Sequence, residues 1–256
     1  MLFFENLRTA VGRYAAGVHH LFGSATDKAL LKAEEQLSCE LPPSYREFLR
    51  SFNGATLFHE TFTLFAVNEV ERSREHPAYL RIGDSPDGEL WLSNDSQGRI
   101  YLVDDESPDP IVVGSSMEPW LNSTLAREGL LVDREGEFRD VFTDDGLTLP
   151  VRRKRIQLGR RHDPGSALYL LEQAELNADE GDLEAAIAAL RQAVELDPHA
   201  GPAWELLATL YLDSDQPDAG VHAAMQAAAA SWHAPLTTAR QLLATRIKTR
   251  SSLRVL

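Results

Sequence analysis

Cysteine is almost absent from this chain of 256 residues, in which Cys39 is the single thiol. One thiol excludes a disulfide within the chain and is typical of proteins from a reducing compartment. No apolar run reaches the length of about 18 residues that a membrane-spanning helix needs. The segment 1–22 also lacks the positive start and continuous apolar block of a secretion signal. We therefore expect a cytoplasmic protein that makes no membrane contact.

The sequence also lacks the short motifs of the common enzyme classes. It contains no glycine-rich phosphate loop and no Gly-x-Ser-x-Gly nucleophile elbow. The pair His59-Glu60 is followed by Thr63 at the place where a zinc protease would carry its second histidine. His19 and His20 are adjacent, and adjacent helical side chains diverge by about 100°, which makes them poor joint ligands. We predict a protein that is not an enzyme and that uses no cofactor or metal.

Positive charge is scarce, because 25 Lys and Arg stand against 39 Asp and Glu, for a net charge of −14. Residues 1–150 hold 13 bases and 26 acids, a balance of −13, while residues 151–256 hold 12 and 13, a balance of −1. An acidic region repels nucleic-acid phosphates and attracts basic proteins. We therefore expect a protein partner for the first region and no direct nucleic-acid ligand, although surface acidity also serves solubility alone.

The first half reads as helices followed by a meander of strands. Apolar residues at steps of three or four predict helices over 2–22, 27–37 and 42–52. Alternating and β-rich stretches predict strands at 61–67, 79–82, 89–93, 99–103 and 111–113, with a closing helix at 117–127. This order predicts an α+β domain over residues 1–130, with an antiparallel sheet packed against helices.

The segment 41–54, LPPSYREFLRSFNG, contains signals for both the start and the end of a helix. Prolines suit a first helical turn, and Asn53-Gly54 suits a left-handed stop. Together with the turn GDSPDGE at 83–89, the run GRIY at 98–101 and Trp120 in the closing helix, this segment resembles the SUKH superfamily over residues 27–130. That superfamily includes the yeast cell-wall assembly regulators and many bacterial immunity proteins that neutralise secreted toxins. The resemblance implies a protein-binding domain, and the helix at 2–22 is additional to the minimal domain.

The second half repeats itself with a period of 34 residues. Asp163-Pro164 recurs as Asp197-Pro198, and small residues recur where two helices would touch. Units 167–200 and 201–234 resemble the tetratricopeptide repeat, which implies an all-α helical repeat domain. We predict that this domain covers 151–250, with 151–162 as a preceding helix, a capping helix at 235–248 and a connection at 131–150 before it.

Carboxylates gather between residues 84 and 109, where Arg99 is the one base. The candidate partner-binding residues in this stretch are Asp84, Asp87, Glu89, Asp95, Asp104, Asp105 and Glu106. Three interpretations remain open: oxygen ligands for Ca²⁺ or Mg²⁺, solvated hairpin turns, and an acidic face that recognises a basic partner. The spacing matches no EF-hand loop, and the resemblance favours the acidic face.

The repeats predict a second candidate surface on their first helices, at Leu171, Glu175, Glu205 and Thr209. This surface carries no cation, so it lacks the means to hold an acidic C-terminus. Binding of a peptide and simple docking, on the first domain or in a dimer, both remain open. The basic cluster at 152–161 is expected to pair with acids inside the chain or across a dimer rather than with nucleic acid.

Two functions follow from these observations. The first is an immunity or immunity-like protein that neutralises a basic toxin by stoichiometric binding. The second is a scaffold or regulatory adaptor that recruits partners through its repeats.

Overall fold

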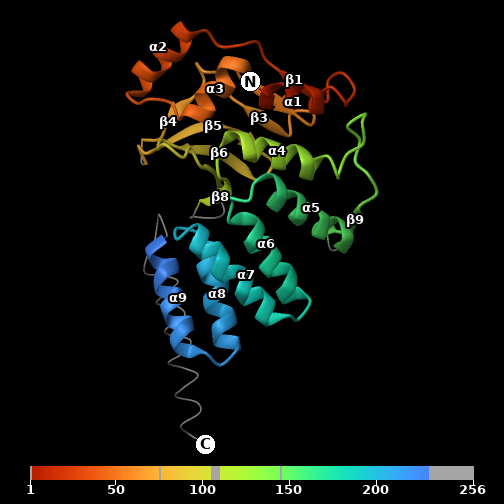
Figure 1. The fold of residues 1–256 in the computed structure, drawn as a ribbon, viewed down its shortest axis with the longest axis vertical. Helices are drawn as coiled ribbons and strands as arrows, with labels where there is room; N and C mark the ends of the chain where they lie inside the picture. Colours follow the sequence, from red (N-terminus) through yellow and green to blue (C-terminus); the bar gives the residue numbers. More distant parts are fainter. Residues whose placement is uncertain (1, 75, 105–109, 145, 231–256) are drawn as a thin grey trace, which may run out of the picture. The chain divides into compact units, whose positions relative to one another are not determined.

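The chain is described by a computed structural model at residues 2–74, 76–104, 110–144 and 146–230. It divides into two compact units (Figure 1). The first unit comprises Met1–Asp104 and Val112–Gly165, and the second comprises Asp105–Ile111 and Ser166–Leu256. The boundary at Gly165 differs from the start at residue 151 that the sequence predicts for the repeats.

The first unit contains five helices among its described residues. They are α1 (Leu2–Val11), α2 (Asp27–Leu37), α3 (Pro43–Ser51), α4 (Met117–Glu128) and α5 (Leu149–His162). The predicted helix over 27–37 is confirmed, and its start is capped by Thr26, whose hydroxyl accepts a hydrogen bond from the Ala29 amide at 3.2 Å. The predicted helix over 42–52 is confirmed as α3, with Pro43 in its first turn.

The prediction of a single N-terminal helix over 2–22 is wrong. The helix ends at Val11, and Gly17 adopts a φ of +96°, which a helix cannot accommodate. Residues His19–Leu21 form strand β1 and pair with β2, so their backbone groups find partners in the sheet. Val18 is nevertheless buried, which explains why the apolar spacing continues past the end of the helix.

Eight strands form one antiparallel sheet in the first unit. They are β1 (His19–Leu21), β2 (Ala55–Leu57), β3 (Phe62–Leu64), β4 (Glu71–Arg72), β5 (Tyr79–Ser85), β6 (Gly88–Ser93), β7 (Ile100–Val103) and β8 (Ile111–Gly114). Their order is β1-β2-β3-β5-β6-β7-β8, and β4 pairs with β5 beside this path. The sheet and the following helices confirm the predicted fold class, although β1, β2 and β4 were not among the predicted strands.

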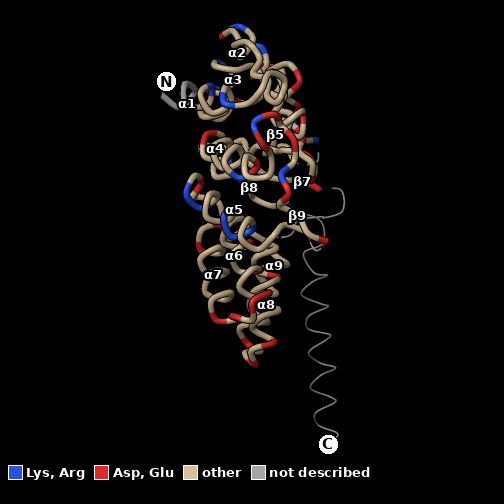
Figure 2. Tube along the Cα trace, turned by 90° about the vertical axis from the view of Figure 1, so that its right-hand side faces the viewer, with Lys and Arg blue, Asp and Glu red and all other residues tan. Residues whose placement is uncertain are grey.

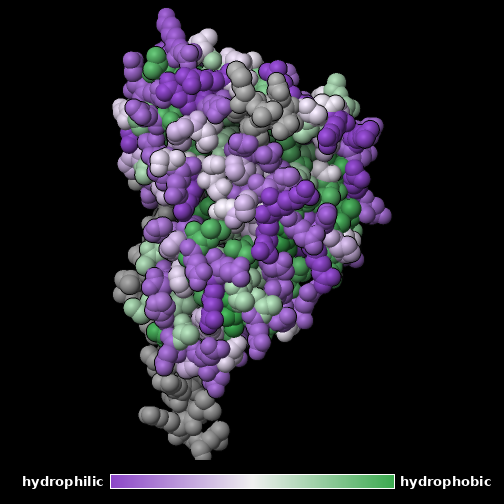
Figure 3. All heavy atoms as spheres, viewed as in Figure 1, coloured by the Kyte–Doolittle hydropathy of each residue, from purple (hydrophilic) through white to green (hydrophobic). Residues whose placement is uncertain are grey.

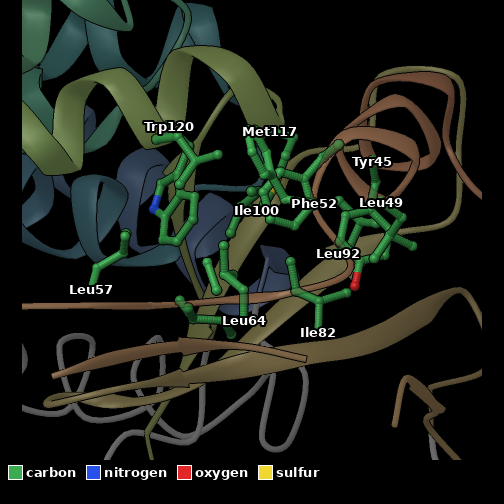
Figure 4. Close-up of a cluster of buried hydrophobic side chains, with 14 of the residues drawn as sticks. Tyr45, Leu49, Phe52, Leu57, Leu64, Ile82, Leu92, Ile100, Met117 and Trp120 are labelled. Carbon is green, nitrogen blue, oxygen red and sulfur yellow. The ribbon is translucent and has the colours of Figure 1, made fainter. Parts of the chain in front are cut away.

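One face of this sheet packs against helices to form the core of the first unit. Leu64, Ile82 and Leu92 point from the strands toward Met117 and Trp120 of α4 (Figure 4). The helix α3 adds Tyr45, Phe48 and Leu49, all completely buried. Side chains alternate along a strand, so the residues between these core positions lie on the opposite face, which we call the outer face.

The connection and α5 belong to the first unit. Strands β9 (Phe142–Thr143) and β10 (Gly146–Leu147) form a short hairpin that leads directly into α5. The helix α5 packs on α4 and buries Ile156 and Gly159. The carboxylate of Asp163, at its end, accepts a hydrogen bond from the Ser115 amide at 2.9 Å. The helix at 151–162, which the sequence predicts as part of the repeat domain, therefore packs within the first unit.

The second unit consists of two helical hairpins over its described residues. They are formed by α6 (Leu168–Asp179) with α7 (Leu183–Leu196), and by α8 (Gly201–Asp213) with α9 (Pro217–Ala230). Fully or nearly fully buried Ala174, Ala186 and Ala208 give the helices the close approach that the repeat pattern predicts. The predicted capping helix at 235–248 lies outside the described residues.

Candidate protein-binding surfaces

The outer face of the sheet carries aromatic side chains. The register pairs Arg81 of β5 with Trp91 of β6, and Trp91 with Tyr101 of β7. Tyr79 belongs to the same face, and its ring meets that of Tyr101 edge-on, with centroids 5.2 Å apart. Tyr79 and Trp91 are partly buried, whereas Tyr101 is buried, with 8% of its surface exposed. Partly buried aromatic residues on a sheet face are a common feature of protein-binding surfaces.

Arg81 gathers two of the predicted carboxylates on this face. Its Nη2 lies 2.8 Å from Oδ1 of Asp84 and 3.2 Å from Oε1 of Glu89. The other oxygen of Glu89 accepts a hydrogen bond from Trp91 Nε1 at 2.8 Å. Burial by itself would lower the pKa of Arg81, but the hydrogen bond to Asp84 and the charge of Glu89 outweigh it, so the pKa rises. We call these four residues the Arg81 cluster.

Arg81 is not among the residues predicted from the sequence, because the carboxylate-rich stretch begins three residues after it, at Asp84. The cation reaches Asp84 because a register shift between Arg81 and Gly83 bends β5 and re-aims its side chains. It reaches Glu89 because Asp84 and Glu89 are direct cross-strand partners. A hairpin prediction that paired 79–85 with 88–93 would have revealed this neighbour.

Two other predicted carboxylates, Asp87 and Asp95, lie in the turns that follow β5 and β6. Asp87 is exposed in the turn between β5 and β6. Asp95 closes the next turn, where its Oδ1 accepts hydrogen bonds from the amides of Gln97 and Gly98, both at 2.8 Å. Asp104 follows β7 and is half-buried, while Asp105 and Glu106 lie outside the described residues. Asp95 therefore has a structural role, as the solvated-turn interpretation supposes.

Two further properties concern membranes and metals. Within the described ranges, no helix is long and apolar enough to cross a membrane. Among the side chains that the structure describes, no group of three His, Cys, Asp or Glu is arranged to hold a metal ion.

The left-handed turn before β3 contacts His19, which is half-buried. Phe58, His59 and Glu60 all have positive φ, at 53°, 53° and 67°, an arrangement that is costly for residues with a Cβ. The Phe58 amide donates a hydrogen bond to Nδ1 of His19 at 3.3 Å. Burial, and then the charge of His59, lower the pKa of His19 to about 4. His19 is therefore neutral near pH 7 and acts as an acceptor that stabilises this turn.

The structure separates the predicted residues of the repeats. Leu171 is buried in the core of the second unit, with 9% of its surface exposed, so it belongs to the packing between helices. Glu175, Glu205 and Thr209 are exposed. Thr209 Oγ1 donates a hydrogen bond to the Glu205 carbonyl oxygen at 3.1 Å. The exposed part of the predicted surface is thus polar and acidic.

The repeats are far more acidic than the balance over 151–256 indicates. Between residues 166 and 230 there are 12 acids and one base, Arg191, which gives 1 − 12 = −11. Figure 2 shows red segments along these helices. Arg191 Nε donates a hydrogen bond to the Tyr211 hydroxyl at 2.7 Å and lies over its ring. The balance over 151–256 conceals this charge because it also counts six cations at 152–161 and five in the sequence after residue 230.

Those cations lie on α5, which contains no acidic residue. Arg155 pairs with Glu128 of α4 at 2.7 Å, so the prediction of pairing inside the chain is confirmed for this residue. Lys154, Arg160 and Arg161 are exposed. The helix therefore combines one inward ion pair with an outward basic surface.

Comparisons with known proteins agree with the two units. Residues 24–123 match the model of the SMI1 / KNR4 family (SUKH-1), and residues 177–230 match a tetratricopeptide repeat model. The search of curated proteins found no match. The match at 24–123 covers the helices α2 and α3, the first part of α4 and the strands that carry the Arg81 cluster. The chain therefore carries a SUKH-1 domain of the SMI1 / KNR4 family followed by tetratricopeptide repeats.

Proposed function

We propose that this protein is an immunity-like inhibitor that acts without catalysis in the cytoplasm and neutralises a basic toxin by stoichiometric binding. The SUKH-1 domain and the repeats both belong to families of protein-interaction modules. The finer assignment rests on one observation, the Arg81 cluster beside Tyr79 and Tyr101 on the outer face. The cluster fixes two carboxylates next to aromatic rings before any partner arrives.

The physical basis is preorganisation combined with charge. Residues 1–150 carry a net charge of −13, which would speed encounter with a basic protein. Carboxylates already held by Arg81 lose little freedom when a partner binds, so the ordering cost of binding is small. Asp87 and Asp104 would add charge near the cluster, while Trp91 would supply apolar contact. Binding would occlude the functional surface of the toxin without chemistry.

The test is capture of the partner by the full chain from its native cell, repeated with two charge-reversal variants. Asp87→Lys with Asp104→Lys changes the proposed surface, and Glu35→Lys with Glu40→Lys makes the same charge change at exposed positions on and after α2. We expect one basic protein in near-stoichiometric yield, reduced at least tenfold by the first variant and retained by the second. Equal recovery by both variants would remove the acidic surface from the account.

A second candidate function is that of an adaptor, and the charge of −11 on residues 166–230 favours it. In that case the repeats would recruit a different basic partner. Replacing Glu205 and Asp213 by Lys in the full chain would then abolish recovery of that partner while leaving the toxin-like protein bound. Several partners lost together in this variant would favour the adaptor over the inhibitor.

A further inference from the structure

The helix α5 presents a row of polar side chains at regular spacing. Arg153, Gln157 and Arg161 follow one another at intervals of four residues, and all three are exposed. Lys154 and Arg160 are exposed beside this row. Residues four apart lie on the same side of a helix, and eight residues span about 12 Å. We call Arg153, Lys154, Gln157, Arg160 and Arg161 the basic row. Figure 2 shows blue segments at α5.

The helix α8 presents the opposite pattern. Glu205, Thr209 and Asp213 also follow one another at intervals of four residues, and all three are exposed. The order along α8 is anion, neutral hydroxyl, anion, whereas the order along α5 is cation, neutral amide, cation. Both rows have the same length because both helices have the same rise per residue. We call these three residues of α8 the acidic row.

We propose that the basic row of one copy binds the acidic row of a second copy. The match in spacing, sign and length between two rows of the same chain favours this occupant over nucleic acid, whose phosphates would also meet the net charge of −14. Each copy carries both rows, so a twofold pair would use each row of each copy once. At physiological ionic strength, repulsion between the two acidic chains is screened beyond about 8 Å, while close pairs persist.

Surface ion pairs alone are weak, so a stable contact also needs apolar area. The segment before α5 and the first residue of that helix supply it. Phe138 and Phe142 are 74% and 46% exposed, with ring centroids 6.0 Å apart, and Leu149 at the first position of α5 is 43% exposed. Figure 3 shows a strongly hydrophilic surface over α5 with apolar atoms beside it, at the place of β9. Exposed aromatic residues next to arginines are typical of the centre of protein interfaces.

The test is the mass of the purified full chain in 0.15 M salt, measured by light scattering or sedimentation over a concentration series. We expect the mass to rise toward twice the 28.4 kDa of one chain, and to return to one chain in 1 M salt. Arg160→Glu with Arg161→Glu should weaken association at least tenfold. Lys28→Glu with Lys32→Glu, the same charge change at exposed positions of α2, should leave it unchanged.

A charge swap decides between this contact and a general charge effect. Glu205→Lys with Asp213→Lys should not associate alone, but an equimolar mixture with the α5 variant should recover paired chains. Circular dichroism of each variant checks that the helices remain folded. The proposal is overturned by a single-chain mass at every concentration, or by a mixture that stays monomeric although both variants fold. Binding of a labelled DNA duplex that needs Arg160 and Arg161, without self-association, would also overturn it and assign α5 to nucleic acid.

Discussion

The two units of this protein use their polar and small residues in different ways. In the first unit, charged side chains bind other parts of the same unit. Arg81 forms ion pairs with Asp84 and Glu89, and Asp163 accepts a hydrogen bond from Ser115, which lies 48 residues earlier in the sequence. Residues 166–230, which contain the repeats, hold 12 acidic residues and one basic residue. Two of these acids, Glu205 and Asp213, are exposed in one row on α8. The carboxylates of Asp84, Glu89 and Asp163 are held by contacts within the first unit, whereas those of Glu205 and Asp213 lie on the surface of α8. A count of acids along the sequence cannot distinguish the two.

The largest expected effect concerns a glycine of the sheet. A Cβ at Gly83 would lie 2.0 Å from the carbonyl oxygen of Thr63 on the neighbouring strand, and backbone atoms cannot move aside cheaply. We expect Gly83→Ala to lower the free energy of unfolding by about 3 kcal/mol or more, as measured by denaturant titration. Gly23→Ala is the matched control, because nothing lies within 4 Å of its Cβ. A stable Gly83→Ala protein would show that β3 and β5 do not approach this closely.

The next prediction compares the loss of stability on replacing Arg81 in the first unit with that on replacing Arg191 in the repeats. Arg81→Leu leaves Asp84 and Glu89 beside each other without their cation, so we expect a loss of about 1–2 kcal/mol at neutral pH. Arg191→Leu removes only a hydrogen bond and a ring contact with Tyr211, and we expect about 0.5 kcal/mol. Both losses are read from urea unfolding of the full chain. Equal losses of unfolding free energy in the two variants would contradict the proposal that Arg81 has a structural role that Arg191 lacks.

A smaller effect concerns pH. Because the pKa of His19 is lowered to about 4 in the folded state, the unfolded state binds the proton more readily. Stability is therefore expected to fall as the pH drops below about 6.5, and to keep falling until about pH 4. His19→Asn keeps an acceptor for the Phe58 amide and cannot be protonated, so its unfolding free energy should depend less on pH in this window.

A pH profile that His19→Asn does not flatten would show that His19 titrates freely, and that the left-handed turn does not depend on its neutral form.

The smallest effect returns to glycine, now in the repeats. A Cβ at Gly220 would lie 2.9 Å from Cγ and 3.0 Å from Cδ2 of the Leu212 side chain, and 3.2 Å from the carbonyl oxygen of Ala208. Alanine favours a helix by about 1 kcal/mol over glycine, while the displaced leucine costs a similar amount. We expect Gly220→Ala to change stability by less than about 1 kcal/mol in thermal unfolding. A loss as large as that of Gly83→Ala would mean that the repeats pack as tightly as the sheet.

Local signals were sufficient to predict much of the fold. The proline at the start of α3 and Asn53-Gly54 after it marked a helix that the structure places at 43–51. The 34-residue period predicted the helical hairpins, because the small residues recur at the positions where neighbouring helices contact each other. Both patterns report interactions between near neighbours in sequence, which single-sequence reasoning can reach.

The errors arose where distant contacts decide the structure. Val18 continues an apolar helical spacing, yet it is buried because β1 joins the sheet, which the spacing does not show. Asp163-Pro164 repeats the later Asp197-Pro198, yet Asp163 is bound to Ser115 in the first unit. In the candidate site, Asp84 and Glu89 were among the predicted carboxylates, but the position of Arg81 beside them and the structural role of Asp95 depend on how the strands pair.

The most direct test of the central claim is a calorimetric titration of the captured basic partner with the full chain, followed by an assay of the partner's toxic activity. The account predicts one-to-one binding that weakens as salt rises, with activity abolished at equivalence. A partner that keeps its full activity when saturated with this protein would contradict inhibition as the function.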